Sequence, residues 1–292
     1  MTTPRSITDV RAIKVRPGAR AEMPEQVATE EPMEIRVGGP GQVPLPLAVT
    51  MRTPGHDFEL AVGFSLTEGV TDRKGVASVS YCDALREGSQ YADRDRYNTV
   101  SVMLYHRWEP VGPPRHFAAS ASCGVCGKSS IEAVEVGCSP VPPAPPIPAS
   151  LVPLLAGRLR PTQRIFDRTG GLHAAGLFAP DGELCCARED VGRHNAVDKV
   201  IGNTVIGNFA PDSGDACRGA SLAGSVLMVS GRVSFEIVQK AAVAGIGTVA
   251  AVSAPTSLAI EAAERLGVAL VAFVRGESFN IYSHAERLAL DG

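Results

Sequence analysis

The chain has 292 residues, of which 45% are hydrophobic and 20% are charged, and its formal net charge is -3. This composition is typical of a globular protein with a sizeable core and argues against a disordered chain. The small net charge and the 5% aromatic content exclude a global basic surface or a stacking platform, so we expect no nucleic-acid partner.

The cellular setting follows from the N-terminus and the cysteines. Residues 1–22 alternate charged and apolar residues and predict neither a secretory signal nor a membrane anchor. No later run is long enough to span a membrane. The seven cysteines do not suggest a disulfide framework in a chain of this size, so we expect a protein of the reducing cytoplasm.

The first half of the chain predicts a small α+β unit. Residues 32–50 alternate apolar and polar around a Gly-Gly-Pro-Gly turn, which is typical of a β-hairpin. Residues 53–57 open a helix that ends before Gly69, and Asp57 and Glu59 suit its N-terminus. Two further strands are expected near residues 77–81 and 99–104.

The loop that follows these strands, Cys-Gly-Val-Cys-Gly from Cys123 through Gly127, is the strongest candidate for chemistry. Its glycines leave two thiols accessible, and Lys128 and local N–H groups favour the reactive thiolate. A zinc site needs a second ligand pair, and the remaining cysteines are poorly spaced for one. A thioredoxin-type site needs a strand-to-helix junction in a βαβ unit, and this half of the chain lacks that pattern. A mobile thiol carrier fits best, and two unreactive cysteines stay open as the alternative.

A proline-rich segment divides the chain. Residues 139–150 contain six prolines. Proline lacks a backbone N–H and fixes φ, so an extended linker or tether is expected here. We therefore predict an N-terminal domain over residues 1–138, a linker over residues 139–150 and a C-terminal domain over residues 151–292.

The second half alternates strands and helices. We expect strands at residues 172–178, 183–188, 225–230, 248–252 and 269–274, the last of these being the final buried strand. Helices are expected at residues 193–201, 234–244 and 257–266, each followed by a glycine. This alternation predicts βαβ units in a mostly parallel sheet covered on both faces. Ligands of such sheets bind beyond the carboxyl ends of the strands.

Four segments of this half hold candidate ligand-binding residues. His173 follows a Gly-Gly pair at a strand start, where a lone histidine is more often a satisfied buried polar group. Residues 188–199 hold seven ionisable residues, including Arg193 and His194, and predict either a binding site or a salt-bridged surface. Two strand ends carry Gly-Arg or Arg-Gly turns that suit phosphate groups. Their residues are Ser230, Gly231 and Arg232, and Phe273, Val274, Arg275, Gly276, Glu277 and Ser278.

Together these motifs resemble the FdhD family of sulfur-carrier accessory proteins of formate dehydrogenase maturation. The segments that carry the resemblance are TPGHDFELAVGFSLTEGV at 53–70, the CGVCG loop, TGGLHAAGLF at 169–178, EDVGRHNAVDK at 189–199, SGRVSFEIVQKAAVAGI at 230–246 and FVRGESFNIYSH at 273–284. Residues 1–30 and the proline-rich segment lie outside it.

The resemblance implies a function and a set of partners. An IscS-type cysteine desulfurase would load sulfane sulfur on Cys123 as a persulfide, with Cys126 as its partner. The chain, acting as a sulfurtransferase, would pass that sulfur to the molybdenum bis(molybdopterin guanine dinucleotide) cofactor before the cofactor enters formate dehydrogenase. Residues 273–278 match the family's cofactor-binding segment. The resemblance also implies a homodimer, and an α/β fold in which a three-layer αβα C-terminal domain similar to cytidine deaminases joins a smaller α+β domain.

Two other classes of function stay as alternatives. A non-catalytic chaperone of the molybdenum cofactor would use the cysteines only as a scaffold. A zinc-dependent deaminase needs His-x-Glu followed by Pro-Cys-x-x-Cys. Here His173 is followed two residues later by Ala175, and the Cys-x-x-Cys pair lies upstream, so deamination is the least favoured.

Overall fold

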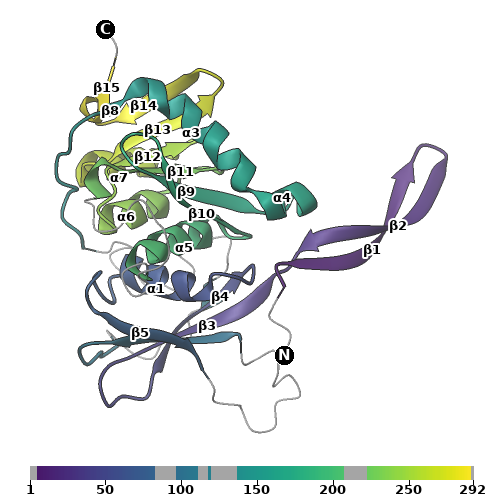
Figure 1. Cartoon of the computed structure of the whole chain (residues 1–292), viewed down its shortest axis with the longest axis horizontal. Coiled ribbons are helices and arrows are strands. Elements are labelled where there is room, and N and C mark those ends of the chain that lie inside the picture. Colours follow the sequence, from purple (N-terminus) through teal and green to yellow (C-terminus); the bar gives the residue numbers. More distant parts are fainter. Residues whose placement is uncertain (1–4, 83–96, 111–117, 120–136, 207–221, 291–292) are drawn as a thin grey trace.

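The computed structural model describes residues 5–82, 97–110, 118–119, 137–206 and 222–290. Two separate sheets with helices between and around them form the body, and a two-stranded arm extends from it (Figure 1). In these ranges no helix combines the length and the apolar character that crossing a bilayer requires.

The first sheet has the strand order β5-β6-β3-β4-β7. Its strands are β3 (Glu31–Gly38), β4 (Leu45–Arg52), β5 (Val76–Tyr81), β6 (Thr99–Leu104) and β7 (Ala118–Ala119). β3 and β4 pair antiparallel, so the hairpin predicted over residues 32–50 is confirmed. Helix α1 (Asp57–Thr67) follows β4 as expected, and its end before Gly69 is confirmed. Met33, Ile35 and Val37 alternate along β3 as fully buried core residues, which fixes its inner face.

The second sheet has the strand order β10-β9-β11-β12-β13-β14. Its strands are β9 (His173–Phe178), β10 (Leu184–Asp190), β11 (Val226–Val229), β12 (Thr248–Ala251), β13 (Ala269–Arg275) and β14 (Ser278–Ser283). Only β11, β12 and β13 run parallel, so the prediction of a mostly parallel sheet is wrong. The remaining pairings are antiparallel: the hairpins β9–β10 and β13–β14, and the pairing of β9 with β11. The strand predicted at residues 269–274 corresponds to β13, and it is followed by β14, in which only Ser283 is buried.

Helices cover both faces of this second sheet (Figure 1). Helices α5 (Arg193–Ile206), α6 (Phe235–Val243) and α7 (Ser257–Leu266) pack on one face, and α3 (Val152–Leu159) packs on the other. Along β11, Val226 and Met228 face α3 whereas Leu227 and Val229 face the three helices, as the two-residue period of a strand requires. The unit is therefore three-layered and mixed α/β; its likeness to cytidine deaminases stays a prediction.

Helix α5 runs past the glycine that was expected to end it. It continues through Gly202 to Ile206, so the predicted end at residue 201 is wrong. A Cβ at Gly202 would overlap the carbonyl oxygen of Glu59 on α1, and a Cβ at Gly63 would overlap that of Asp198 on α5. The glycines serve close helix packing instead of termination. One continuous buried cluster spans both sheets through these helices, and the division into domains at residues 138 and 150 stays a prediction.

The proline-rich segment is extended, as expected, but it is packed on the body. Its β8 (Ile147–Pro148) pairs parallel with β15 (Leu288–Ala289), and the buried Arg287 guanidinium donates to the carbonyl oxygens of Val141 and Pro142. Val141 and Ile147 are both less than 5% exposed. These contacts make the segment a strap along the second sheet and not a free tether.

The N-terminal strands form an arm that the sequence did not predict. β1 (Ile7–Arg16) and β2 (Ala19–Ala28) pair antiparallel along their whole length and turn at Gly18, whose φ of 76° suits glycine. We call residues 7–28 the β1–β2 arm. Its base lies against helix α4 (Arg164–Thr169), where the Arg168 Nε donates to the Gln26 side-chain oxygen at 3.0 Å.

Candidate ligand cavity

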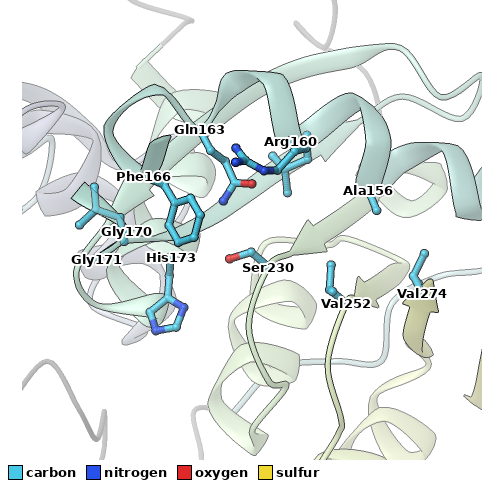
Figure 2. A pocket seen from close by; sticks show the side chains of 12 residues that line it. Ala156, Arg160, Gln163, Phe166, Gly170, Gly171, His173, Ser230, Val252 and Val274 are labelled. Atoms are coloured by element: carbon cyan, nitrogen blue, oxygen red, sulfur yellow. The ribbon is translucent and has the colours of Figure 1, made fainter. Parts of the chain in front are cut away.

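A cavity of about 670 Å³ opens at the carboxyl ends of the parallel strands β11, β12 and β13. Figure 2 shows Arg160, Gln163 and Phe166 on one side and Ser230, Val252 and Val274 at the strand ends on the other. The cavity therefore lies where the sequence predicted a ligand to bind. Its lining residues are Ala156, Leu159, Arg160, Gln163, Phe166, Gly170, Gly171, Leu172, His173, Ser230, Val252 and Val274.

The segment from α3 to β9 forms the roof of the cavity because of two local features. At the start of α4, the Glu189 carboxylate accepts hydrogen bonds from the N–H groups of Ile165 and Phe166, which fixes the helix over β10. At its end, Gly170 adopts a left-handed conformation with φ of 66° and turns the chain into β9. The Thr-Gly-Gly motif thus sets the distance between the roof and the strands.

Gln163 is the most informative polar residue of the roof. It is only 7% exposed, and within the described part of the chain its amide makes no hydrogen bond. Figure 2 shows this amide extending into the cavity between Phe166 and Ser230. This amide therefore offers a donor and an acceptor to a ligand in the cavity. The sequence does not indicate Gln163 as a binding residue, because no local motif distinguishes it from other glutamines.

Phe166 and Arg160 form a flat surface beside Gln163. The Arg160 guanidinium lies 5.3 Å from the centre of the Phe166 ring, and Arg160 also pairs with Asp167. Because the charge of Arg160 is already opposed by a carboxylate, the roof offers an aromatic face and little net charge. Such a surface suits a planar, uncharged heterocycle better than a phosphate group.

His173 and Ser230 provide polar groups on the strand side. The Ser230 hydroxyl oxygen accepts from the N–H of Ala174 at 2.9 Å, which leaves its proton to donate. Burial, followed by the positive charges of Arg193 and His194, lowers the pKa of His173 and favours its neutral form. Contrary to the expectation of a satisfied buried histidine, His173 is half-buried on the cavity wall, with no hydrogen bond from its ring among the described residues.

The two predicted binding residues on α5 have different surroundings. His194 is buried, and its Nε2 lies 3.1 Å from the Ser234 hydroxyl and 3.0 Å from the Glu236 carboxylate. Burial raises the pKa of Glu236, but the hydrogen bond and charge of His194 outweigh it and lower that pKa to about 2. Arg193 lies near Gly231 and His173, and its buried Nε has no hydrogen-bond partner among the residues that the structure describes. Arg193 is thus placed near the cavity, whereas His194 ties α5 to α6.

The structure brings few of the other predicted binding residues to the cavity. Within residues 273–278 only Val274 lines it, while the side chains of the turn after β13 are exposed. Arg275 stacks 5.7 Å from the ring of Phe273, whose φ of 55° is unusual for a bulky residue. Ser230 lines the cavity and Gly231 lies beside His173, whereas Arg232 is exposed outside the lining. The exposed turn residues are Arg275, Gly276, Glu277 and Ser278.

Much of the charged motif at residues 188–199 is buried and paired inside the protein. Asp190 and Lys199 form an ion pair of 2.7 Å with side chains at most 1% exposed. The Asp190 carboxylate also accepts from the N–H of Thr53, and the Lys199 ammonium donates to the Thr53 carbonyl. Asn195 donates to the Met51 carbonyl. The motif therefore holds the β4–α1 junction against β10 and α5.

The predicted sulfur-bearing residues, Cys123 and Cys126, lie outside the described residues.

The sheets and the cavity define a mixed α/β protein with a cavity at the strand ends of its second sheet. The FdhD/NarQ family model matches residues 28–289, and the chain belongs to this family. Proteins named sulfur carrier protein FdhD are similar throughout: that of Streptomyces coelicolor is 45% identical over 96% of this chain and 95% of its own. That of Mycobacterium tuberculosis is 47% identical over 91% and 92%.

A solved structure supports the fold. A crystal structure provisionally described as a formate dehydrogenase accessory protein from Desulfotalea psychrophila matches with a TM-score of 0.72. The match covers 98% of this chain and 100% of the other at 24% identity.

Proposed function

We propose that this protein is a sulfur carrier for the maturation of formate dehydrogenase. The observation that carries the proposal is its family membership along residues 28–289, with full-length relatives that are named sulfur carriers. The Cys-x-x-Cys loop supplies the residues that such a role needs, and the cavity at the strand ends offers a place for a small molecule.

In this proposal Cys123 receives a sulfane sulfur from a cysteine desulfurase of the IscS type. A persulfide sulfur attached to an accessible, low-pKa cysteine can be passed on by exchange chemistry, with Cys126 as the neighbouring thiol. The acceptor would be the molybdenum bis(molybdopterin guanine dinucleotide) cofactor, which is cargo and leaves for formate dehydrogenase. The setting is expected to be the reducing cytoplasm.

The cavity supports a specific way of holding that cargo. Its volume lies within the usual range of small-molecule sites, so it suits one ring system of the cofactor and not the whole of it. The Phe166 face, the Gln163 amide and the Ser230 hydroxyl would hold a heterocycle. The phosphates would lie outside, toward Arg193 and Arg232.

A bacterial strain that lacks its own member of the family tests the function. Cys123→Ala should abolish formate dehydrogenase activity in that strain, while Cys82→Ala, which changes a cysteine outside the loop, should restore activity as well as the unaltered chain. Full activity with Cys123→Ala would contradict the carrier role and favour the non-catalytic chaperone.

A further inference from the structure

The outer end of the β1–β2 arm projects away from the body of the molecule (Figure 1). Among the described residues, the side-chain hydrogen bonds and ion pairs of the arm lie in its inner half, and the outermost of them joins Arg11 to Glu22. We call the segment beyond this pair, residues 13–21, the arm tip. Every residue of the arm tip is exposed. The family model begins at residue 28, so the arm tip has no part in defining the family.

The arm tip is basic. It contains Lys14, Arg16 and Arg20 and no acidic residue. None of these three side chains forms a hydrogen bond or an ion pair with another residue in the described ranges. Because the whole chain carries a net charge of -3, the residues outside the arm tip carry -6. A negatively charged surface therefore attracts the arm tip and repels the rest of the protein, which favours an approach with the tip first.

Exposed apolar side chains lie among these cations. Ile13 and Val15 are 62% and 75% exposed and point to the same face of β1. Two residues of a strand span about 7 Å, which lies within the depth of about 5–10 Å to which membrane-surface elements bury their apolar side. Lysine and arginine tolerate such a position, because their apolar stems let the charged ends reach the headgroups.

This combination of side chains favours a lipid bilayer over a nucleic acid. A nucleic-acid backbone would pair with the basic residues, but it offers no apolar region for Ile13 and Val15. Residues 5–28 also contain no aromatic ring on which a base could stack. An anionic bilayer provides both negatively charged headgroups and an acyl boundary. We propose that the arm tip docks this protein on an anionic membrane surface, with Ile13 and Val15 entering the headgroup region.

The length of the arm explains how a negatively charged protein can bind such a surface. A strand of ten residues spans about 33 Å. The Debye length at physiological ionic strength is only about 8 Å, so the body would lie beyond the range in which the membrane repels it strongly. The arm thus separates the attraction of its tip from the repulsion of the body.

Co-sedimentation of the full-length chain with lipid vesicles tests the docking. Vesicles of phosphatidylcholine mixed with phosphatidylglycerol should carry the protein into the pellet, whereas vesicles of phosphatidylcholine alone should leave it in solution. High salt should release most of the bound protein, because it screens the attraction between the arm tip and the headgroups. Equal binding to both kinds of vesicle would overturn the proposal. No binding to the anionic vesicles would overturn it as well, including the case in which the chain retains duplex DNA instead.

A charge-matched pair of double variants tests whether the arm tip is the binding surface. Arg16→Gln with Arg20→Gln should weaken binding to the anionic vesicles about 25-fold, since each basic residue near such a surface contributes about fivefold. Lys74→Gln with Arg107→Gln removes the same charge from exposed positions beside β5 and β6, and its binding should stay close to that of the unaltered chain. Equal losses for the two double variants would show that the arm tip has no special role.

A single apolar substitution tests whether the tip enters the headgroup region. Val15→Ser should weaken binding about fivefold, because it removes most of one apolar side chain from the membrane boundary. Val43→Ser is the matched control, because Val43 is 81% exposed on the body and lies outside the arm. That variant should bind as the unaltered chain does. Unchanged binding of Val15→Ser would contradict the entry of the tip into the bilayer.

Discussion

Gly63 of α1 and Gly202 of α5 lie directly against each other's helix, and this contact joins the two sheets. A Cβ on either residue would overlap a backbone carbonyl oxygen of the facing helix. Backbone atoms cannot move aside as a flexible side chain can, so the two helices would have to separate. The contact therefore requires glycine at both positions.

Gly202→Ala should lower the free energy of unfolding by about 1–3 kcal/mol, the usual cost of overpacking a core. Gly157→Ala on α3 is the matched control, because a Cβ there meets no atom within 4 Å. That substitution should be neutral or stabilising by about 0.5–1 kcal/mol, since alanine is the better helix former. Urea denaturation of both variants checks this, and equal stability of the two would refute the role given to Gly202.

Lys199→Met should destabilise the protein by about 3–5 kcal/mol, because it leaves the Asp190 carboxylate buried without its counter-ion. Adding Asp190→Asn to the same chain should recover part of that loss, since an amide is less costly to bury than an unpaired charge. Denaturation of the single and double variants measures the coupling. Additive losses would mean that the two side chains do not act as a pair.

The ionised Glu59 carboxylate on α1 stabilises the folded protein, so we expect the protein to lose stability in acid. Burial raises its pKa, but hydrogen bonds from Arg188 and His56 outweigh burial and lower the pKa from 4.5 to about 2. A lowered pKa in the folded state adds stability above pH 4.5 that is lost as the pH falls toward 2. This shift in the pKa corresponds to a contribution of about 3 kcal/mol to the free energy of unfolding. Glu59→Gln should flatten the pH dependence of unfolding in this window, and an unchanged slope would contradict the assignment.

Gln163→Leu should weaken binding of guanosine diphosphate about three- to tenfold, the effect of losing one or two neutral hydrogen bonds at similar side-chain volume. Arg275→Ala was expected from its position at a strand end to matter strongly. Because Arg275 is exposed and outside the cavity lining, its loss should cost about 1 kcal/mol or less. Calorimetric titration of both variants compares their losses of binding affinity. A larger loss for Arg275→Ala would show that the ligand binds outside the cavity.

Local signals predicted most elements of the body. Helix α7 was predicted with its observed bounds because Gly267 follows it in a left-handed conformation that glycine favours. The same logic failed at Gly202, whose purpose depends on a helix 139 positions earlier in the chain. Strand β14 was missed because its apolar residues Phe279 and Ile281 alternate with polar ones over only six residues, so no apolar run marks it.

The candidate site was predictable in place but not in detail. Strand ends indicated where a ligand would bind, and Ser230 and Val274 do line the cavity. Gln163 and Phe166 could not be assigned, because their approach to those strands depends on the cap from Glu189. The cluster of charges at residues 188–199 was visible, but its pairing with Thr53 across the chain is a tertiary contact that spacing does not reveal.

The sulfur-carrier role is tested most directly by the intact mass of the protein after incubation with a cysteine desulfurase and cysteine. We expect an added mass of about 32 Da, one sulfur atom, that a reducing agent removes and that Cys123→Ala abolishes. Cys82→Ala should retain it. No reducible addition, or one that persists in Cys123→Ala, would contradict the claim that Cys123 carries the sulfur.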